Sequence, residues 1–336
     1  MRLGSAEISV TPAHRYESAA GSCWPVSIMP APGELLSSWL HRLAYANGVP
    51  PRYFGAFLGA PGENWSARLD RVLPDRILRL LGVHTRIPLE DIAALTVAPD
   101  PLARLRLPLR PGSRQTCAPG MQATWLQVCP ACLAEDETPY FRRGWTLATR
   151  VSCFRHGCRL RDRCPSCKRG LAPFSQKRLV PHQICALCGA ALCKRTRPAN
   201  DGVRRLERLI DDLLRLHVAG HRMGEGRSLP GLLGSASFQS GAQRMSIARL
   251  PHRDRFQLFR QLTEGRSTPF GKRRSPAISC WKRVVQAAPT WRGLAISFTD
   301  ATLPQTTVGP CSASAGPRLA DLVQTAARLH QKRQAL

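Results

Sequence analysis

The sequence is poor in acidic residues. Of its 336 residues, 22 are Asp or Glu and 49 are Lys or Arg, which gives a formal net charge of +27. A nuclease site built on carboxylates needs clustered acids to hold its metal ions, and here the acids are scattered. The excess of positive charge indicates a polyanionic partner, and nucleic acid is the commonest one.

Long apolar runs are also missing. No stretch approaches the ~20 apolar residues of a membrane-spanning helix, so we expect no membrane contact. The first 28 residues contain Glu7 and Glu17 and no continuous apolar core, unlike a secretory signal peptide. We therefore expect a cytoplasmic protein. In a reducing compartment, the 13 cysteines favour metal binding over disulfides.

Several catalytic motifs are absent. The sequence contains no GxxxxGK[ST], GxSxG or HExxH. The parts for nucleotide hydrolysis, serine hydrolysis and zincin chemistry are therefore missing. We expect no catalytic residues, no organic cofactor and no enzymatic activity.

The pattern of apolar residues predicts a mainly α protein with small zinc-stabilised α/β fingers. A helix-turn-helix-like block comes first, tandem zinc fingers follow, and the C-terminal region is helical. The expected segments are a leader (1–30), the helical block (31–97), a linker (98–120), the tandem zinc-finger region (121–197), a helix (198–220), a flexible linker (221–245) and a basic, poorly assigned C-terminal region (246–336).

Two stretches carry the clearest helical periodicity. In the first, Leu36, Trp39, Leu40 and Leu43 share one face, and Asn47-Gly48 provides a stop. Short helices at 52–58 and around 75–81 would complete a helix-turn-helix outline, which packed helices also produce.

The second stretch, 203–218, has an apolar stripe, with Glu207, Asp211 and Asp212 alternating with arginines on the opposite face. A terminal helix is expected near 319–333.

Four ligand pairs of x2 spacing lie within 60 residues. Gaps of 20, 7 and 17 residues separate them. Two such pairs supply the four tetrahedral ligands of a structural zinc ion. The pairs are Cys129 and Cys132, Cys153 and His156, Cys164 and Cys167, and Cys185 and Cys188.

The order of pairing stays open at this point. The seven residues between His156 and Cys164 favour two consecutive sites, and a RING-type cross-brace is the alternative. Cys158 and Cys193 could substitute as ligands, although a small buried residue or free thiol is the simpler interpretation. Either pairing fills both sites with four ligands and leaves no open position, so we expect two structural Zn²⁺ ions.

Positive charge is densest between these ligands. Residues 140–200 contain 14 Lys or Arg and one acid, Asp162. Like charges at this density repel each other, and phosphates would neutralise them. The candidate DNA contacts are Arg142, Arg143, Arg150, Arg155, Arg159, Arg161, Arg163, Lys168 and Arg169.

Several stretches in this order resemble the TniQ family of bacterial transposon proteins, which is related to TnsD. The resemblance covers about 30–193. The stretches are Pro32–Gly48, Val128–Glu135, Pro139–Trp145, Val151–Gly157, Leu160–Cys167 and Ile184–Gly189.

The resemblance implies a nucleoid-associated accessory protein that selects a transposition target. Such proteins read DNA or a CRISPR guide complex, recruit an AAA+ ATPase that acts beside a DDE transposase, and often form dimers. The resemblance also implies that the fingers carry the zinc ions and that the helices at 33–58 carry partner or DNA contacts. No motif matches the C-terminal third, which would be divergent or truncated. The alternative is a DNA-binding transcription regulator.

Overall fold

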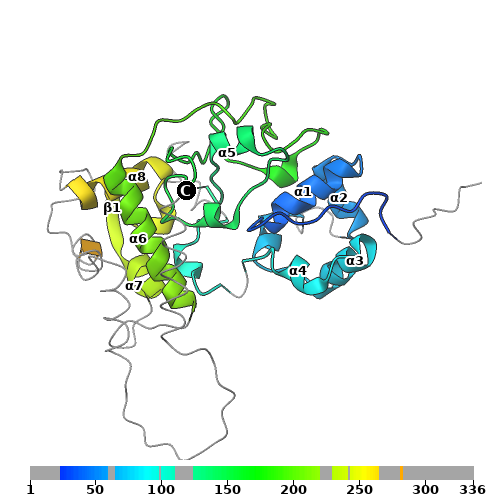
Figure 1. The fold of residues 1–336 in the computed structure, drawn as a ribbon, viewed down its shortest axis with the longest axis horizontal. Coiled ribbons are helices and arrows are strands. Elements are labelled where there is room, and N and C mark those ends of the chain that lie inside the picture. The colour runs from blue at the N-terminus through cyan, green and yellow to red at the C-terminus, as the bar shows by residue number, and fades with distance from the viewer. Residues whose placement is uncertain are drawn as a thin grey trace, which may run out of the picture. The chain divides into compact units, whose positions relative to one another are not determined.

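The computed structural model describes residues 23–59, 65–97, 100–109, 124–219, 229–240, 243–264 and 281–282. Most regular structure in these residues is helical, and they contain one two-stranded sheet (Figure 1). The expectation of a mainly α fold is therefore confirmed. The helix expected near 319–333 and most of the leader lie outside the described residues.

The N-terminal helical block is organised around α1. The block contains α1 (Leu36–Ala46), α2 (Pro51–Phe57), the 3-10 helix η2 (Ala67–Asp70), α3 (Asp75–Thr85) and α4 (Leu89–Ala93). The four residues of the predicted α1 stripe, together with Leu35 before it, are fully buried. At its N-terminus, the backbone N–H of Ser37 donates to Oδ1 of Asp70 at 2.7 Å. Asp70 thus supplies the cap that Leu35, at the N-cap position, cannot provide.

The turn from α1 to α2 follows the sequence closely. Asn47 ends α1, and Gly48 has φ +70°, the left-handed conformation that glycine adopts without strain. Pro51 then starts α2 at a position where its missing N–H costs no hydrogen bond.

Residues 124–200 contain little regular structure. They hold α5 (Pro130–Glu135) and the 3-10 helices η4 (Arg143–Thr146) and η5 (Pro173–Ser175). The backbone otherwise pairs through isolated bridges such as Ser152 with Arg159. In place of a continuous apolar layer, the buried cluster here contains cysteines beside Leu, Phe and Trp side chains.

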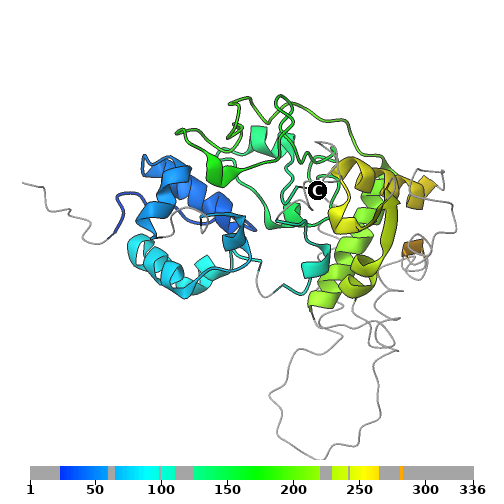
Figure 2. The ribbon, with the colours of Figure 1, turned by 180° about the vertical axis from the view of Figure 1, so that it is seen from behind.

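The third core lies around α6 (Asp201–Val218). Asn200 caps this helix by accepting from the N–H of Val203 at 2.9 Å. α6 packs against α8 (His252–Glu264) and α7 (Leu229–Ser235). The strands β1 (Ser237–Ser240) and β2 (Gln243–Ser246) form an antiparallel hairpin, and the 3-10 helix η7 (Ile247–Arg249) follows it (Figure 2).

Two segments expected to be linkers contribute to this core. The expected linker at 98–120 contains the 3-10 helix η3 (Ala103–Leu105), and Leu105 and Leu107 are buried against the α6 core. The expected flexible linker at 221–245 contains α7 and the hairpin, with Leu233 and Phe238 fully buried. Both segments are rich in polar residues and glycine, so their sequence pattern did not single out these few apolar residues. Their burial depends on long-range partners, which the local sequence does not reveal.

No helix in the described part of the chain combines the length and the apolar character needed to cross a membrane.

Candidate metal centres

The eight predicted ligands meet in two groups of four. Cys129, Cys132, Cys153 and His156 form the first cluster, and Cys164, Cys167, Cys185 and Cys188 form the second cluster. Within each group the ligand atoms all lie within 4.8 Å of one another. The structure therefore joins the pairs consecutively, and the cross-brace order is not the one observed.

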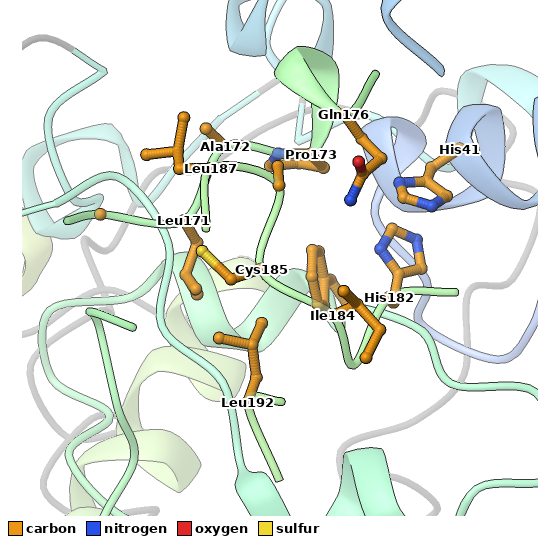
Figure 3. Close-up of a pocket in the computed structure, with 13 residues that line it drawn as sticks. His41, Leu171, Ala172, Pro173, Gln176, His182, Ile184, Cys185, Leu187 and Leu192 are labelled. Atoms are coloured by element: carbon orange, nitrogen blue, oxygen red, sulfur yellow. The ribbon is translucent and has the colours of Figure 1, made fainter. Parts of the chain in front are cut away.

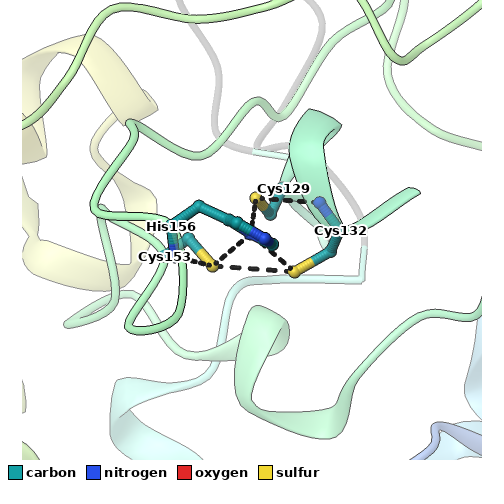
Figure 4. A group of neighbouring side chains, drawn as sticks. All are labelled: Cys129, Cys132, Cys153 and His156. Carbon is teal, nitrogen blue, oxygen red and sulfur yellow. Dashed lines mark hydrogen bonds between the residues drawn. The ribbon is translucent and has the colours of Figure 1, made fainter. Parts of the chain in front are cut away.

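In the first cluster, α5 sets the positions of two thiols. Cys129 is the N-cap residue of α5, and Cys132 lies on its first turn. Cys153 and His156 belong to a tight turn that Gly157 ends at φ +62°. The Nδ1 atom of His156 lies 3.4, 3.3 and 3.6 Å from the sulfurs of Cys129, Cys132 and Cys153 (Figure 4).

The second cluster repeats this arrangement with two cysteine turns. The Sγ atoms of Cys164 and Cys188 lie 3.6 Å apart, and those of Cys167 and Cys185 lie 3.9 Å apart. Each turn brings its last N–H back to the first cysteine's carbonyl: Lys168 (φ +61°) donates to Cys164 and Gly189 (φ +78°) to Cys185. These left-handed residues close the turns and aim both thiols the same way.

The sulfur separations fit a tetrahedral ion. Zinc binds thiolate at about 2.3 Å, so two sulfurs on a tetrahedral ion lie about 3.8 Å apart. The distances of 3.6 and 3.9 Å in the second cluster, and 3.7 Å between Cys132 and Cys153 in the first, match this value. Both clusters could therefore hold a metal ion, and their donor set is consistent with zinc.

Glu135 orients the histidine ligand. Its Oε2 atom lies 2.8 Å from Nε2 of His156. Because Nε2 donates to this carboxylate, the lone pair is on Nδ1, the atom that faces the three thiols. Burial lowers the pKa of His156, but the hydrogen bonds and charges of Glu135 and Cys153 together raise it more, so the net shift is upward. Sequence reasoning missed Glu135, although its place at the end of the Cys-Pro-Ala-Cys helix was a usable signal.

Hydrogen bonds within the clusters favour thiolate on particular cysteines. Hydrogen bonds from the thiols of Cys129 and Cys132 hold the pKa of Cys153 far below its ordinary value. In the second cluster, the backbone N–H of Ala190 lowers the pKa of Cys188 to about 6. Thiolate is the form that binds metal, so one cysteine in each cluster favours the metal-binding form.

Two further cysteines lie close to the clusters. The Sγ atom of Cys158 is 3.4 Å from that of Cys129, yet Cys158 is not among the four residues whose ligand atoms converge. Cys193 packs partly buried against the cysteine-containing core. The structure thus places both outside the ligand sets.

The predicted DNA contacts near the first cluster already have partners. Arg142 donates to both carboxylate oxygens of Asp136, at 2.9 and 3.0 Å. Arg150 donates to Asp211 of α6 at 2.5 Å and lies 3.9 Å over the ring of Phe154. Both acids come from outside the 140–200 window, so they relieve the charge repulsion around Arg142 and Arg150.

Three more of these candidates also contact protein groups. Arg155 is exposed and forms an ion pair with Glu135 at 3.2 Å. Arg143 donates to the carbonyl oxygen of Ala94, and Arg159 lies 3.8 Å over an aromatic ring of α8. These side chains bind the segments of the protein together.

The remaining candidates differ in exposure. Arg161 is half-buried, and Arg163 donates to the carbonyl oxygen of Lys168 at 3.3 Å. Lys168 and Arg169 are exposed.

Among the described residues, the cations around the second cluster form no ion pair with an acid. No ion pair in the described residues joins them to a carboxylate, and the stretch 163–200 contains no acid. We call these seven exposed residues the second-cluster cations: Lys168, Arg169, Lys177, Arg178, Lys194, Arg195 and Arg197.

Glu207 is buried, contrary to the helical-wheel expectation that placed it on the polar face of α6. Its carboxylate accepts from the N–H groups of Val151 and Ser152 and from the Ser152 hydroxyl. Burial raises the pKa of Glu207 to about 7. Only the position of the first cluster's loop beside α6 reveals this role, so no pattern within the helix could have found it.

Comparison with known proteins identifies part of the chain. No curated protein matches it. The model of the TniQ family matches residues 25–160, a span that includes the helical block and the whole first cluster. Over these residues the chain is similar to the TniQ family, a family of transposition accessory proteins.

Proposed function

We propose that this protein is a non-enzymatic accessory factor of transposition that selects the target site. It would bind DNA or a guide complex and recruit an AAA+ transposition ATPase and its DDE transposase. The TniQ match over residues 25–160 carries the proposal. The two cysteine clusters and the basic surface around the second cluster support it.

Each cluster would hold one structural Zn²⁺ ion. Four protein ligands fill a tetrahedral ion, so neither site offers a position for water or substrate. The surrounding core is small, and five of its fifteen buried residues are cysteines of the two clusters. The metal ions would therefore supply stability that this segment cannot obtain from apolar burial alone.

Metal removal tests this role. We expect two zinc ions per purified chain by elemental analysis, and one in a Cys164→Ser, Cys185→Ser variant. Excess EDTA should make 121–197 sensitive to protease, because this segment contains little regular secondary structure to hold it. Two bound ions whose removal leaves the protease pattern unchanged would contradict the structural role.

The second-cluster cations are the best-placed DNA contacts. They are exposed and form no ion pair with a carboxylate that the structure describes, whereas Arg142, Arg150 and Arg155 are engaged within the protein. An unpaired cation can neutralise a phosphate without first breaking an internal ion pair. This places the proposed contact surface around the second cluster.

The recruiting role has a direct test. The full chain should retain an AAA+ transposition ATPase in a pull-down, and target DNA should increase the amount retained. Retention in neither condition would remove the recruiting role. Binding to DNA without any ATPase association would instead favour the transcription-regulator alternative.

A further inference from the structure

Three buried side chains line a small cavity beside the second cluster. They are His41 of α1, Gln176 directly after η5, and His182, which precedes the ligand Cys185. Their exposed fractions are 4%, 1% and 2%. The cavity has a volume of ≈ 20 Å³, and Figure 3 shows the two imidazole rings and the amide around it.

Hydrogen bonds fix the tautomer of both histidines. Nε2 of His41 lies 3.0 Å from the carbonyl oxygen of Val180, and Nε2 of His182 lies 3.0 Å from that of Ser38. A carbonyl oxygen only accepts, so each Nε2 carries the proton. Burial lowers the pKa of His41 to about 4 and that of His182 well below its ordinary value, so both rings are neutral.

Each ring therefore presents an unprotonated Nδ1. Both Nδ1 atoms are buried and have no hydrogen-bond partner in the protein. The ring centroids of His41 and His182 are 3.9 Å apart, and both residues line the same cavity. This arrangement offers two acceptors to anything in the cavity.

Gln176 contributes one donor. Its Oε1 accepts from the backbone N–H of Arg178 at 3.0 Å, which fixes the orientation of the amide. The Nε2 group is then a donor, and it too is buried without a partner. In Figure 3 the amide of Gln176 lies beside the rings of His41 and His182.

The two acceptors and one donor determine which kind of ligand the cavity can hold. A cation would meet the N–H hydrogens of the Gln176 amide, and an anion would meet the lone pairs of both histidines. A water molecule donates twice and accepts once, which satisfies all three groups. Buried waters typically make about three hydrogen bonds, and a cavity needs roughly 10–15 Å³ to hold one.

We propose that this cavity binds one structural water molecule, which joins α1 to the segment that carries the second cluster. The water donates to Nδ1 of His41 and of His182 and accepts from Nε2 of Gln176. Ser38 continues the same network on the other side of His182, because its hydroxyl donates to Glu34 at 2.7 Å. The helical block and the segment that carries the second cluster are thus connected by a hydrogen-bonded network that contains this water.

Protein–water NMR tests the site in the zinc-loaded full chain. With histidine labelled, we expect cross-relaxation from a long-lived water to the Hε1 protons of both His41 and His182. The ring ¹⁵N shifts should show the Nε2–H tautomer for both. The absence of these water contacts in the wild-type protein would overturn the proposal.

Two variants and a metal titration sharpen the test. Gln176→Leu removes the donor and should abolish both water contacts. Gln183→Leu changes a nearby glutamine that does not line the cavity, and it should leave them intact. A third equivalent of bound zinc that shifts the Nδ1 signals of both rings would also overturn the proposal, because the site would then bind metal.

Discussion

His156 is the only nitrogen ligand in either cluster, and its geometry depends on a residue that touches no metal position. At the scale of the single residue, Glu135 fixes the ring by accepting from Nε2 at 2.8 Å. The same carboxylate pairs with Arg155 at 3.2 Å. A ligand whose orientation is held in this way loses less entropy when the ion binds.

We expect Glu135→Gln to weaken zinc binding at the first cluster by roughly 10- to 100-fold, the range found for such supporting residues. Competition with a chromophoric chelator would measure this, with the second cluster as an internal reference. Glu137→Gln is the matched control, because Glu137 is exposed on the same loop. Equal affinities for the two variants would show that Glu135 does not support the site.

At the scale of the element, a buried carboxylate of α6 forms hydrogen bonds with the loop of the first cluster. Glu207 accepts from the backbone of Val151 and Ser152, just before the ligand Cys153. The group is 2% exposed, and burial raises its pKa to about 7 from 4.5. These hydrogen bonds to Glu207 therefore hold the loop of the first cluster in position on α6.

The raised pKa of Glu207 predicts a pH dependence. Below about pH 4.5 the Glu207 carboxyl is protonated in both the folded and the unfolded state, so its ionisation does not lower the free energy of unfolding. As the pH rises from about 4.5 to about 7, the unfolded state ionises first, so folding is progressively penalised by up to roughly 3 kcal/mol.

Glu207→Gln keeps an acceptor for the backbone N–H groups and cannot ionise. Relative to wild type, its free energy of unfolding should therefore rise by roughly 2 kcal/mol between about pH 5.5 and pH 8 in urea titrations. Glu90→Gln, on the exposed surface of α4, should show no such trend. A difference that does not change with pH would mean that Glu207 is already ionised in the folded state.

At the scale of the whole molecule, the net charge sets the general attraction to polyanions. The distribution of charge sets which side chains are available to bind one. The formal charge of +27 favours any polyanion, and that preference needs no particular fold. The tertiary structure separates cations that hold the protein together from exposed cations that form no ion pair with a described carboxylate. Arg255 illustrates the first kind: it is fully buried and donates to Ala148 and Gln127 across the α6 core.

Neutralising four second-cluster cations should weaken duplex DNA binding and flatten its salt dependence. Each lost phosphate contact lowers the slope of log K against log salt by roughly 0.9. Fluorescence anisotropy at several salt concentrations would measure both effects. The quadruple variant replaces Lys168, Arg169, Lys194 and Arg195 by Gln.

A variant of equal charge provides the comparison. It replaces four exposed arginines elsewhere, Arg52, Arg68, Arg79 and Arg104, by Gln. We expect it to bind DNA more tightly than the second-cluster variant. If both lose affinity and slope equally, the protein attracts DNA by its overall charge alone and the second cluster has no special part.

The sequence by itself determined the local features. The spacing of Cys and His predicted which eight residues converge, because a tight turn with two intervening residues brings its ligands together whatever surrounds it. The stripes of α1 and α6 likewise predicted two helices that the structure contains, at Leu36–Ala46 and Asp201–Val218. Helical periodicity is a property of neighbouring residues, so the chain alone displays it.

Only the tertiary structure decided the features that depend on distant partners. It selected the consecutive order of ligand pairs, buried Glu207 beside Val151, and paired Arg150 with Asp211. It also brought His41 against His182, two residues that no local pattern connects. Burial and ion pairing arise from contacts across long stretches of chain, and a single sequence contains no record of which stretches meet.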